Sequence, residues 1–148
     1  MLISNIRENG VPIGALPDGE MHFHHDMLHA EMPHKGTCLY SVEVPSHGGN
    51  TLFANCYRAY ETMPKDLRDK LEGKRAFNSY TLGEQKRGDG HGIQHVKMAS
   101  HPVFRTHEET GRKAVSVNRL MTDHVEGMDR AESDRLLNAV YDHSENPD

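Results

Sequence analysis

Two side chains near the start of the chain have the types and the spacing of metal ligands. His24 and Asp26 stand two residues apart in the run MHFHHD at positions 21–26. If this run is extended, both side chains point to the same face, because side chains alternate along a strand. An imidazole and a carboxylate on one face supply part of the ligand set of a non-heme Fe(II) site, which leaves other coordination positions open.

Two other interpretations of this run stay open. The chain has 12 histidines, so a His-x-Asp spacing arises easily by chance in a polar strand end that faces solvent. Alternatively, His22 shares the face of His24 and Asp26, and all three bind one divalent metal such as zinc. Residues four apart on a strand lie roughly 13 Å from each other, which is a long reach for one ion. His25 is expected to face the other way, as a surface group or a group behind the ligands.

Two further motifs follow in order along the chain. Residues 48–53 read GGNTLF, and residues 101–114 read HPVFRTHEETGRKA. Together with FHHD at positions 23–26, they resemble the TauD/TfdA family of Fe(II)- and 2-oxoglutarate-dependent dioxygenases. Members of that family carry W-H-x-D, then a Gly-Gly-[Asp/Asn]-Thr turn, then a segment beginning His-Pro and ending Thr-Gly-Arg-Lys. Phe23 stands where the family has Trp, which keeps an aromatic side chain beside the histidine.

The resemblance implies a function and a set of site residues. His24 and Asp26 would bind Fe(II), and Thr51 would hydrogen-bond the carboxylate of the cosubstrate 2-oxoglutarate. The enzyme would be an oxidoreductase that hydroxylates a small, anionic organic substrate and releases succinate and CO₂. Asn78 stands where several relatives have a histidine or asparagine near the substrate. No catalytic role is expected for Arg105, His107 or Arg112 of the later motif.

The pattern of elements indicates a mainly β fold with flanking helices. Residues 37–44 alternate apolar and polar side chains, which predicts a strand ended by Pro45. Residues 83–98 are rich in Gly and charged groups and predict either a lid or a solvated loop. The resemblance narrows the fold to a partial double-stranded β-helix, or jelly roll, in a single domain spanning 1–148. The remaining expectations are strands at 51–55, 75–82, 101–106 and 113–118, and helices at 57–63, 64–71 and 129–144.

Composition and charge restrict the partners. The formal charge of −5 is mild and spread along the chain, so neither nucleic acid nor an anionic membrane is an expected partner. No apolar run approaches the ~18 residues of a membrane span. Cys38 and Cys56 form no recognisable metal or redox spacing, which favours free thiols in the cytoplasm. A small molecule is therefore the expected partner.

The chain is shorter than the family pattern requires. The resemblance implies that the domain is incomplete, and that the third iron ligand and the arginine gripping 2-oxoglutarate lie beyond Asp148. A hydrophobic content of 35% with no Trp agrees with a piece of a larger core. We therefore expect the chain alone to lack turnover and to associate as a homo-oligomer through exposed strand edges. Two alternatives remain: a non-catalytic remnant, and a divalent-metal cupin-like protein that uses His22, His24 and Asp26.

Overall fold

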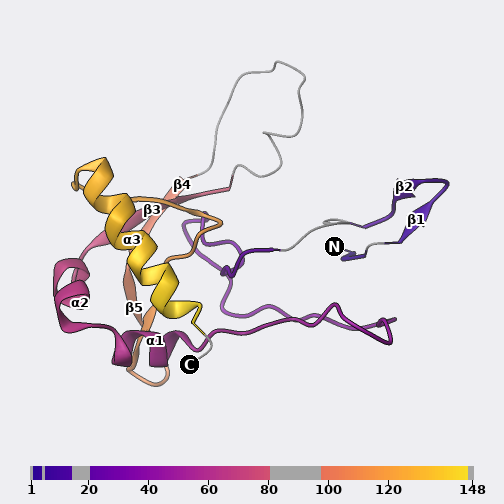
Figure 1. Ribbon diagram of the computed structural model, residues 1–148, viewed down its shortest axis with the longest axis horizontal. Coiled ribbons are helices and arrows are strands. Elements are labelled where there is room, and N and C mark those ends of the chain that lie inside the picture. Colours follow the sequence, from indigo (N-terminus) through magenta and orange to yellow (C-terminus); the bar gives the residue numbers. More distant parts are fainter. Residues whose placement is uncertain (1, 5, 15–20, 81–97, 147–148) are drawn as a thin grey trace, which may run out of the picture.

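A computed structural model describes residues 2–4, 6–14, 21–80 and 98–146 (Figure 1). Within these residues, strands and a few helices alternate along the chain, in agreement with the expected class. The strands are β1 (Arg7–Glu8), β2 (Val11–Pro12), β3 (Arg75–Ser79), β4 (Met98–Pro102), β5 (Phe104–Thr106), β6 (Lys113–Val115) and β7 (Thr122–Val125). The helices are α1 (Cys56–Thr62), α2 (Lys65–Leu71) and α3 (Arg130–Ser144).

A three-stranded antiparallel sheet forms the centre of the body. β3 lies between β4 and β7, and the ladder with β7 shifts register between Phe77 and Asn78. β5 and β6 form a separate hairpin, in which Phe104 lies opposite Val115. The hairpin predicted across residues 109–111 is therefore confirmed, whereas His101 and Pro102 belong to β4 instead. β7 was not expected from the sequence, since only Val125 of its four residues is both apolar and buried.

Each expected helix is present, and local signals explain where each begins. The side chain of Asn55 accepts a hydrogen bond from the backbone N–H of Arg58 and caps α1. α2 begins directly after Pro64, whose ring suits a helix start. The Asp129 carboxylate accepts from two backbone N–H groups and caps α3. No helix in the described ranges is long and apolar enough to cross a membrane.

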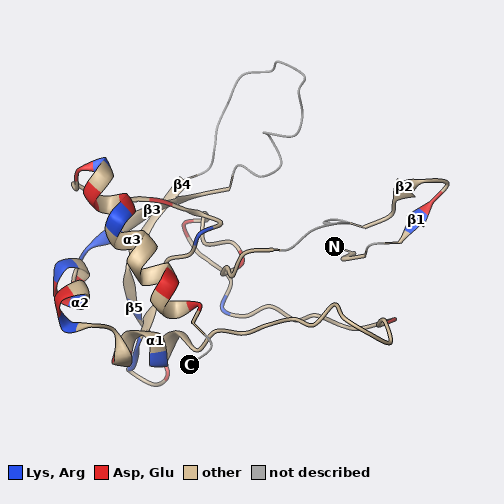
Figure 2. Ribbon diagram, in the orientation of Figure 1, with Lys and Arg blue, Asp and Glu red and all other residues tan. Residues whose placement is uncertain are grey.

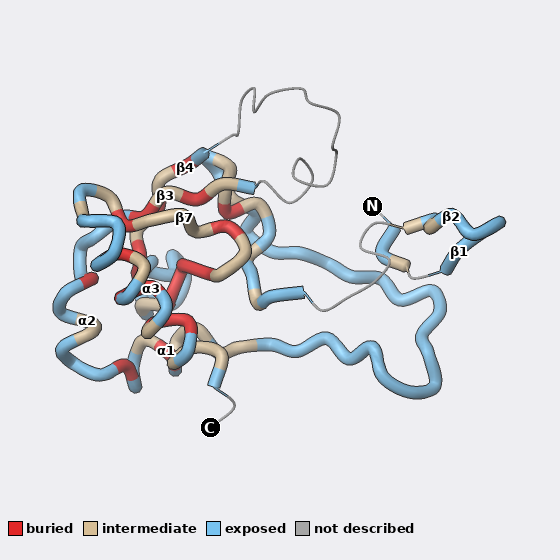
Figure 3. Tube along the Cα trace, turned by 45° about the horizontal axis from the view of Figure 1, so that its top comes forward, coloured by how far each residue is buried: buried red, intermediate tan, exposed pale blue. Residues whose placement is uncertain are grey.

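The hydrophobic core lies between the helices and the sheet. α3 lies across the sheet in Figure 1, and buried residues gather there in Figure 3. Leu136 and Val140 are one helical turn apart on α3, so both side chains face the sheet. The core residues that are less than 2% exposed are Leu71, Ala76, Val103, Val125, Leu136 and Val140.

A long segment without regular structure leaves this body. Residues 36–53, here called the arm, extend away from the sheet in Figure 1, and all of them are exposed. Figure 2 shows that the arm is nearly free of charge; Glu43 is its single charged residue. Its apolar side chains include Tyr40 and Phe53, which are 91% and 89% exposed.

The strands predicted at 37–44 and 51–55 are therefore wrong for the described structure. Alternation sets the two faces of a strand, but a strand also needs a neighbouring strand for its backbone N–H and C=O groups. The arm has no such neighbour among the described residues. Asn55, the last residue of the second segment, caps α1 instead. The predicted strand at 75–82 is confirmed as β3 for its first five residues. Nearly all of the predicted loop at 83–98 lies outside the described residues.

Candidate metal site

His24 and Asp26 lie side by side at the surface of the body. The Nε2 atom of His24 is 3.3 Å from Oδ1 of Asp26. Their side chains therefore share a face, as expected, although the segment 21–26 forms no strand with any described residue. The two side chains are 28% and 43% exposed, so an ion and small molecules can reach both.

The second ring nitrogen of His24 sets the orientation of the imidazole. Nδ1 is 2.8 Å from the backbone carbonyl oxygen of His22. A carbonyl only accepts hydrogen bonds, so Nδ1 carries the proton and donates it, and the lone pair of the neutral ring is on Nε2. A histidine that binds a metal through one nitrogen commonly donates from the other to a backbone carbonyl. His24 is thus arranged as an Nε2 ligand.

The spacing of the pair fits one octahedral ion. Two ligand atoms at right angles, each about 2.1 Å from an ion, lie roughly 3 Å apart, and the observed distance is 3.3 Å. No third His, Cys, Asp or Glu side chain completes a metal-binding group within the described part of the chain. The three-ligand grouping with His22 is accordingly not formed here, and His22 contributes its backbone carbonyl instead.

The other oxygen of Asp26 has a partner in the arm. The hydroxyl of Thr37 donates a hydrogen bond of 2.7 Å to Oδ2. One carboxylate oxygen thus faces His24, while the other is held by a residue eleven positions later. Sequence reasoning placed Thr37 only in a strand and missed this contact.

A tight turn follows the pair and anchors it to the body. Met27 has a φ of 59°, a left-handed conformation that costs a non-glycine residue roughly 1–2 kcal/mol. The turn is closed by the N–H of Ala30 bonding to the carbonyl of Met27, and Leu28 is 2% exposed. His101 of β4 donates from Nε2 to the carbonyl of Ala30 at 2.9 Å. The pair is therefore tied to the central sheet within a few residues.

His25 faces away from the pair and contacts two other elements. Its Nδ1 is 3.5 Å from Nδ2 of Asn118, which can only donate, so Nδ1 accepts and Nε2 carries the proton toward the Cys56 sulfur 3.7 Å away. Burial is the largest cause that lowers the pKa of His25, and the neighbouring His24 ring and the positive charge of Arg105 lower it further. The expectation that His25 faces the other way is confirmed, but the ring is half-buried rather than free in solvent.

Asn118 is a residue that sequence reasoning did not single out. Its Oδ1 accepts from the backbone N–H groups of Leu120 and Met121, and its Nδ2 meets His25. An asparagine that bonds the backbone two residues later is a recognised turn former, which is the signal that was available. This side chain links the segment bearing the pair to the turn before β7.

The thiols of Cys56 and Cys38 are expected to react at different rates with an alkylating reagent. Burial raises the pKa of the Cys56 thiol, so less of it is thiolate near neutral pH, and its access is restricted. Cys38 is exposed in the arm. Mass spectrometry after timed iodoacetamide treatment should show Cys56 modified more slowly, by on the order of tenfold or more. Equal alkylation rates for Cys38 and Cys56 in the folded chain would contradict the burial of Cys56. So would rapid alkylation that remains in Cys38→Ser, where Cys56 is the remaining thiol.

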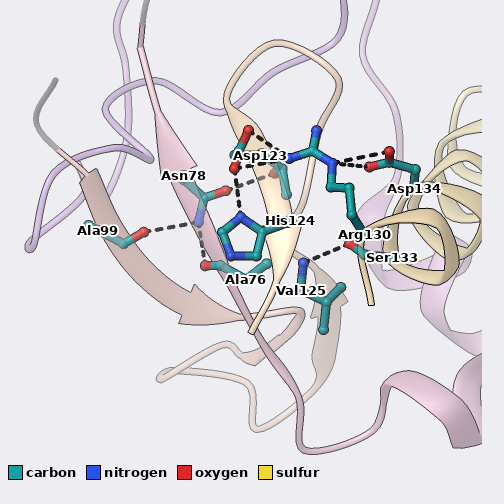
Figure 4. Close-up of polar contacts among 10 residues, drawn as sticks. Ala76, Asn78, Ala99, Asp123, His124, Val125, Arg130, Ser133 and Asp134 are labelled. Carbon is teal, nitrogen blue, oxygen red and sulfur yellow. Dashed lines mark hydrogen bonds and ion pairs between the residues drawn. The ribbon is translucent and has the colours of Figure 1, made fainter. Parts of the chain in front are cut away.

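His124 on β7 belongs to a separate polar network. Figure 4 shows its ring beside Asp123, with Nδ1 2.6 Å from the Asp123 carboxylate. Arg130 contacts the same carboxylate at 3.3 Å, and Phe77 packs on the histidine ring with centroids 5.1 Å apart. The His124 hydrogen bond and then the Arg130 charge hold the pKa of Asp123 below its ordinary value. None of these described side chains contacts His24 or Asp26.

His143, the other late histidine, joins two helices. Its Nε2 is 3.1 Å from the carbonyl of Ala59 and 3.1 Å from the hydroxyl of Thr62. Both partners belong to α1, so this side chain fastens α3 to α1. His143 therefore has a structural role in the described body.

Asn78 is fully buried in β3 and satisfied within the sheet. Figure 4 shows its amide between the backbone carbonyls of Ala76 and Ala99, while Oδ1 accepts a 2.7 Å hydrogen bond from Thr122. With three internal hydrogen bonds and no exposed surface, Asn78 offers no group to a substrate in this conformation. The position expected near the substrate is thus a structural one here.

Neither Thr51 nor Arg112 has a hydrogen bond or ion pair with His24 or Asp26 in the described part of the chain. Thr51 is exposed near the end of the arm and makes no hydrogen bond with His24 or Asp26 among the described residues. Arg112 pairs with Glu61 at 2.5 Å, and its guanidinium stacks over Tyr57 at 4.3 Å from the ring centre. These contacts fasten the β5–β6 hairpin to α1.

Relatives of known name match nearly the whole chain. A Schizosaccharomyces pombe protein provisionally named an alpha-ketoglutarate-dependent sulfonate dioxygenase is 34% identical, over 84% of this chain and 32% of its own length. The (S)-phenoxypropionate/alpha-ketoglutarate-dioxygenase of Sphingobium herbicidovorans is 29% identical, over 95% of this chain and 55% of its own length. The chain thus spans about a third to a half of the relatives it matches.

A solved structure matches the fold as well. A Burkholderia xenovorans protein, provisionally named an alpha-ketoglutarate-dependent taurine dioxygenase, superposes with a TM-score of 0.67 and 26% identity, over 84% of this chain and 42% of its own. The family model described as "Taurine catabolism dioxygenase TauD, TfdA family" matches residues 1–148. The chain belongs to the TauD/TfdA dioxygenase family.

Proposed function

We propose that His24 and Asp26 bind Fe(II) in a 2-oxoglutarate-dependent dioxygenase site. The observation that carries the proposal is the 3.3 Å contact between Nε2 of His24 and Oδ1 of Asp26, with Nδ1 of His24 donating to a backbone carbonyl. Family membership gives this contact its meaning, because relatives are named for their dependence on alpha-ketoglutarate, which is 2-oxoglutarate. When bound, Fe(II) and 2-oxoglutarate would activate O₂, whose one oxygen atom enters succinate as 2-oxoglutarate loses CO₂ while the other becomes the hydroxyl group at a C–H bond of the substrate.

The residues of the chain would hold and orient this chemistry. His24 contributes a neutral nitrogen ligand and Asp26 a single negative charge, which neutralises part of the charge of the ion. The turn at Met27 and the contact between His101 and Ala30 keep the pair on the central sheet. The exposure of both ligands leaves room for small molecules on their outer side.

The proposed substrate is a small anionic organic molecule. Sulfonates and (S)-phenoxypropionate appear in the names of the relatives that match this chain. Both classes place a negative group beside a C–H bond. The proposed fold is a jelly roll, in which the alternating side chains of the arm would lie in a sheet. A second copy of the chain is the proposed partner for the exposed apolar side chains of the arm.

Anaerobic addition of Fe(II) and 2-oxoglutarate tests the proposed function. The expected result is a weak visible metal-to-ligand absorption band that requires both components. Zinc replaces iron in the control and should give no band. No band with both components present, together with tight zinc binding that is lost in His22→Ala, would contradict the proposal and favour the divalent-metal alternative.

Thr51 is proposed as a hydrogen-bond donor to 2-oxoglutarate, on the strength of its place in the motif GGNTLF. Replacing Thr51 by Ala should raise the 2-oxoglutarate concentration that half-saturates the visible band by roughly ten- to a hundredfold. This range corresponds to the loss of one hydrogen bond to a charged oxygen, about 1.5–3 kcal/mol. Thr51→Ser should restore most of the binding. An unchanged half-saturation in Thr51→Ala would remove Thr51 from the site.

A further inference from the structure

We infer that Thr37 is a positioning residue that fixes which oxygen of Asp26 is free to bind the metal. This inference rests on the proposed function of the His24–Asp26 pair. Its basis is the hydrogen bond of 2.7 Å from the Thr37 hydroxyl to Oδ2 of Asp26, together with the 3.3 Å approach of Oδ1 to His24.

The two oxygens of a carboxylate compete for one ion. A carboxylate free to rotate can present either oxygen, or both, and binding through both occupies two coordination positions. Thr37 contacts Oδ2 alone, so Oδ2 is turned away from the ion and Oδ1 remains beside Nε2 of His24. The arrangement favours single-oxygen binding, which keeps a further coordination position available for the two oxygens of a cosubstrate.

Thr37 is well placed to act on Asp26 through its hydroxyl rather than through packing. It lies at the base of the arm, where its backbone forms no strand and the whole residue is exposed. Within the described ranges, its hydrogen bond to Asp26 is the one side-chain hydrogen bond that joins the arm to the segment bearing the pair. Nearby, Lys35 pairs with Glu109 at 2.6 Å, so the base of the arm has a second attachment that does not involve Asp26. Loss of the hydroxyl should therefore leave the chain in place.

Three variants separate these effects. Thr37→Val keeps the shape of the side chain and removes the hydroxyl, whereas Thr37→Ser keeps the hydroxyl and removes the methyl group. Thr106→Val makes the same chemical change at an exposed threonine of β5 and serves as the matched control. Groups that orient metal ligands commonly change metal affinity by 10–100-fold. Because Thr37 is exposed and water can replace its hydroxyl, the lower end of this range is expected.

The experiment titrates each variant with Mn(II) alone and follows the free Mn(II) signal by electron paramagnetic resonance. Mn(II) accepts imidazole and carboxylate ligands and resists oxidation during the titration. We expect Thr37→Val to raise the Kd for Mn(II) about tenfold. Thr37→Ser and Thr106→Val should bind like the unmodified chain. The thermal unfolding midpoint without metal should be the same for all four proteins.

The outcomes distinguish this inference from the proposed function. An unchanged Kd in Thr37→Val, with binding lost in His24→Ala, would overturn the role of Thr37 and leave the metal pair intact. A Kd raised equally in Thr37→Val and Thr37→Ser would also overturn it, because the hydroxyl would not be the cause. Mn(II) binding that survives in His24→Ala, or is absent from the unmodified chain, would overturn the pair and the role of Thr37 together.

Discussion

Replacing His24 by alanine is expected to remove specific divalent-metal binding and, with it, any Fe(II)-dependent reaction. Nε2 of His24 is one of the two neighbouring atoms proposed to bind the ion, and no other described His, Cys, Asp or Glu side chain joins them in a metal-binding group. Loss of groups that merely orient ligands weakens metal binding by 10–100-fold. Loss of a ligand itself should therefore weaken Mn(II) binding by more than about a hundredfold. Asp26→Ala should have the same effect.

Two further histidine variants make this result specific. His47→Ala removes an exposed histidine of the arm and is the matched control, for which unchanged Mn(II) binding is expected. His22 contacts His24 only through its backbone carbonyl, which an alanine keeps. The His22→Ala variant should therefore also bind Mn(II) normally. A large loss of affinity in His22→Ala would instead support the three-ligand alternative with His22, His24 and Asp26. Wild-type affinity in His24→Ala would show that the pair is not the metal site.

Replacing Asn78 by alanine is expected to destabilise the fold strongly. Asn78 is fully buried at the point where the β3–β7 ladder shifts register, and its side chain bonds two backbone carbonyls and the Thr122 hydroxyl. Removing it leaves these groups without their partner and creates a small cavity. Each buried polar group left unsatisfied costs about 1–3 kcal/mol, so the loss of three partners should lower the free energy of unfolding by at least about 3 kcal/mol. Equilibrium urea denaturation measures this change.

A double-mutant cycle with Thr122→Val tests the reason for that loss. If the hydrogen bond between Asn78 and Thr122 matters, the two single changes should be non-additive by about 0.5–3 kcal/mol. If Asn78→Ala lowered the free energy of unfolding by less than about 0.5 kcal/mol, as ordinary surface substitutions do, Asn78 would have no structural role. Such a result, combined with a loss of substrate binding, would return Asn78 to the substrate role that its sequence position suggests.

Local signals made the helices predictable. Asn55, Pro64 and Asp129 each mark a helix start through capping or a fixed φ, and these effects act over a few neighbouring residues. The β5–β6 hairpin was predictable for the same reason, since its turn contains Gly111 with a φ of 68°. Elements that depend on nearby residues alone therefore followed from the sequence.

Elements that depend on distant partners could not be predicted from the sequence. β7 is polar except at Val125, and it is a strand because β3 offers it a ladder. The arm alternates apolar and polar side chains as a strand does, yet no described strand lies beside it to complete one. Pairing is decided by the whole fold, so a pattern within eight residues cannot settle it.

The candidate site likewise has a local part that the sequence predicted and long-range contacts that it did not predict. The spacing of His24 and Asp26 predicted that the two side chains share a face, because that relation is local. The contacts of Thr37 with Asp26 and of Asn118 with His25 join residues 11 and 93 positions apart. Nothing in the local pattern around Thr37 or Asn118 specifies those partners, so only the folded chain identifies them.

Pulsed electron paramagnetic resonance of the Mn(II)-loaded chain tests the central claim most directly, because it detects nitrogen bound to the ion. Binding through Nε2 of His24 predicts a nitrogen modulation of the Mn(II) echo that disappears in His24→Ala and persists in His47→Ala. When the histidines carry ¹⁵N in place of ¹⁴N, the frequencies of this modulation should shift, because the two isotopes differ in nuclear spin and magnetic moment. A nitrogen modulation that is unchanged in His24→Ala would contradict the assignment of His24 as a metal ligand.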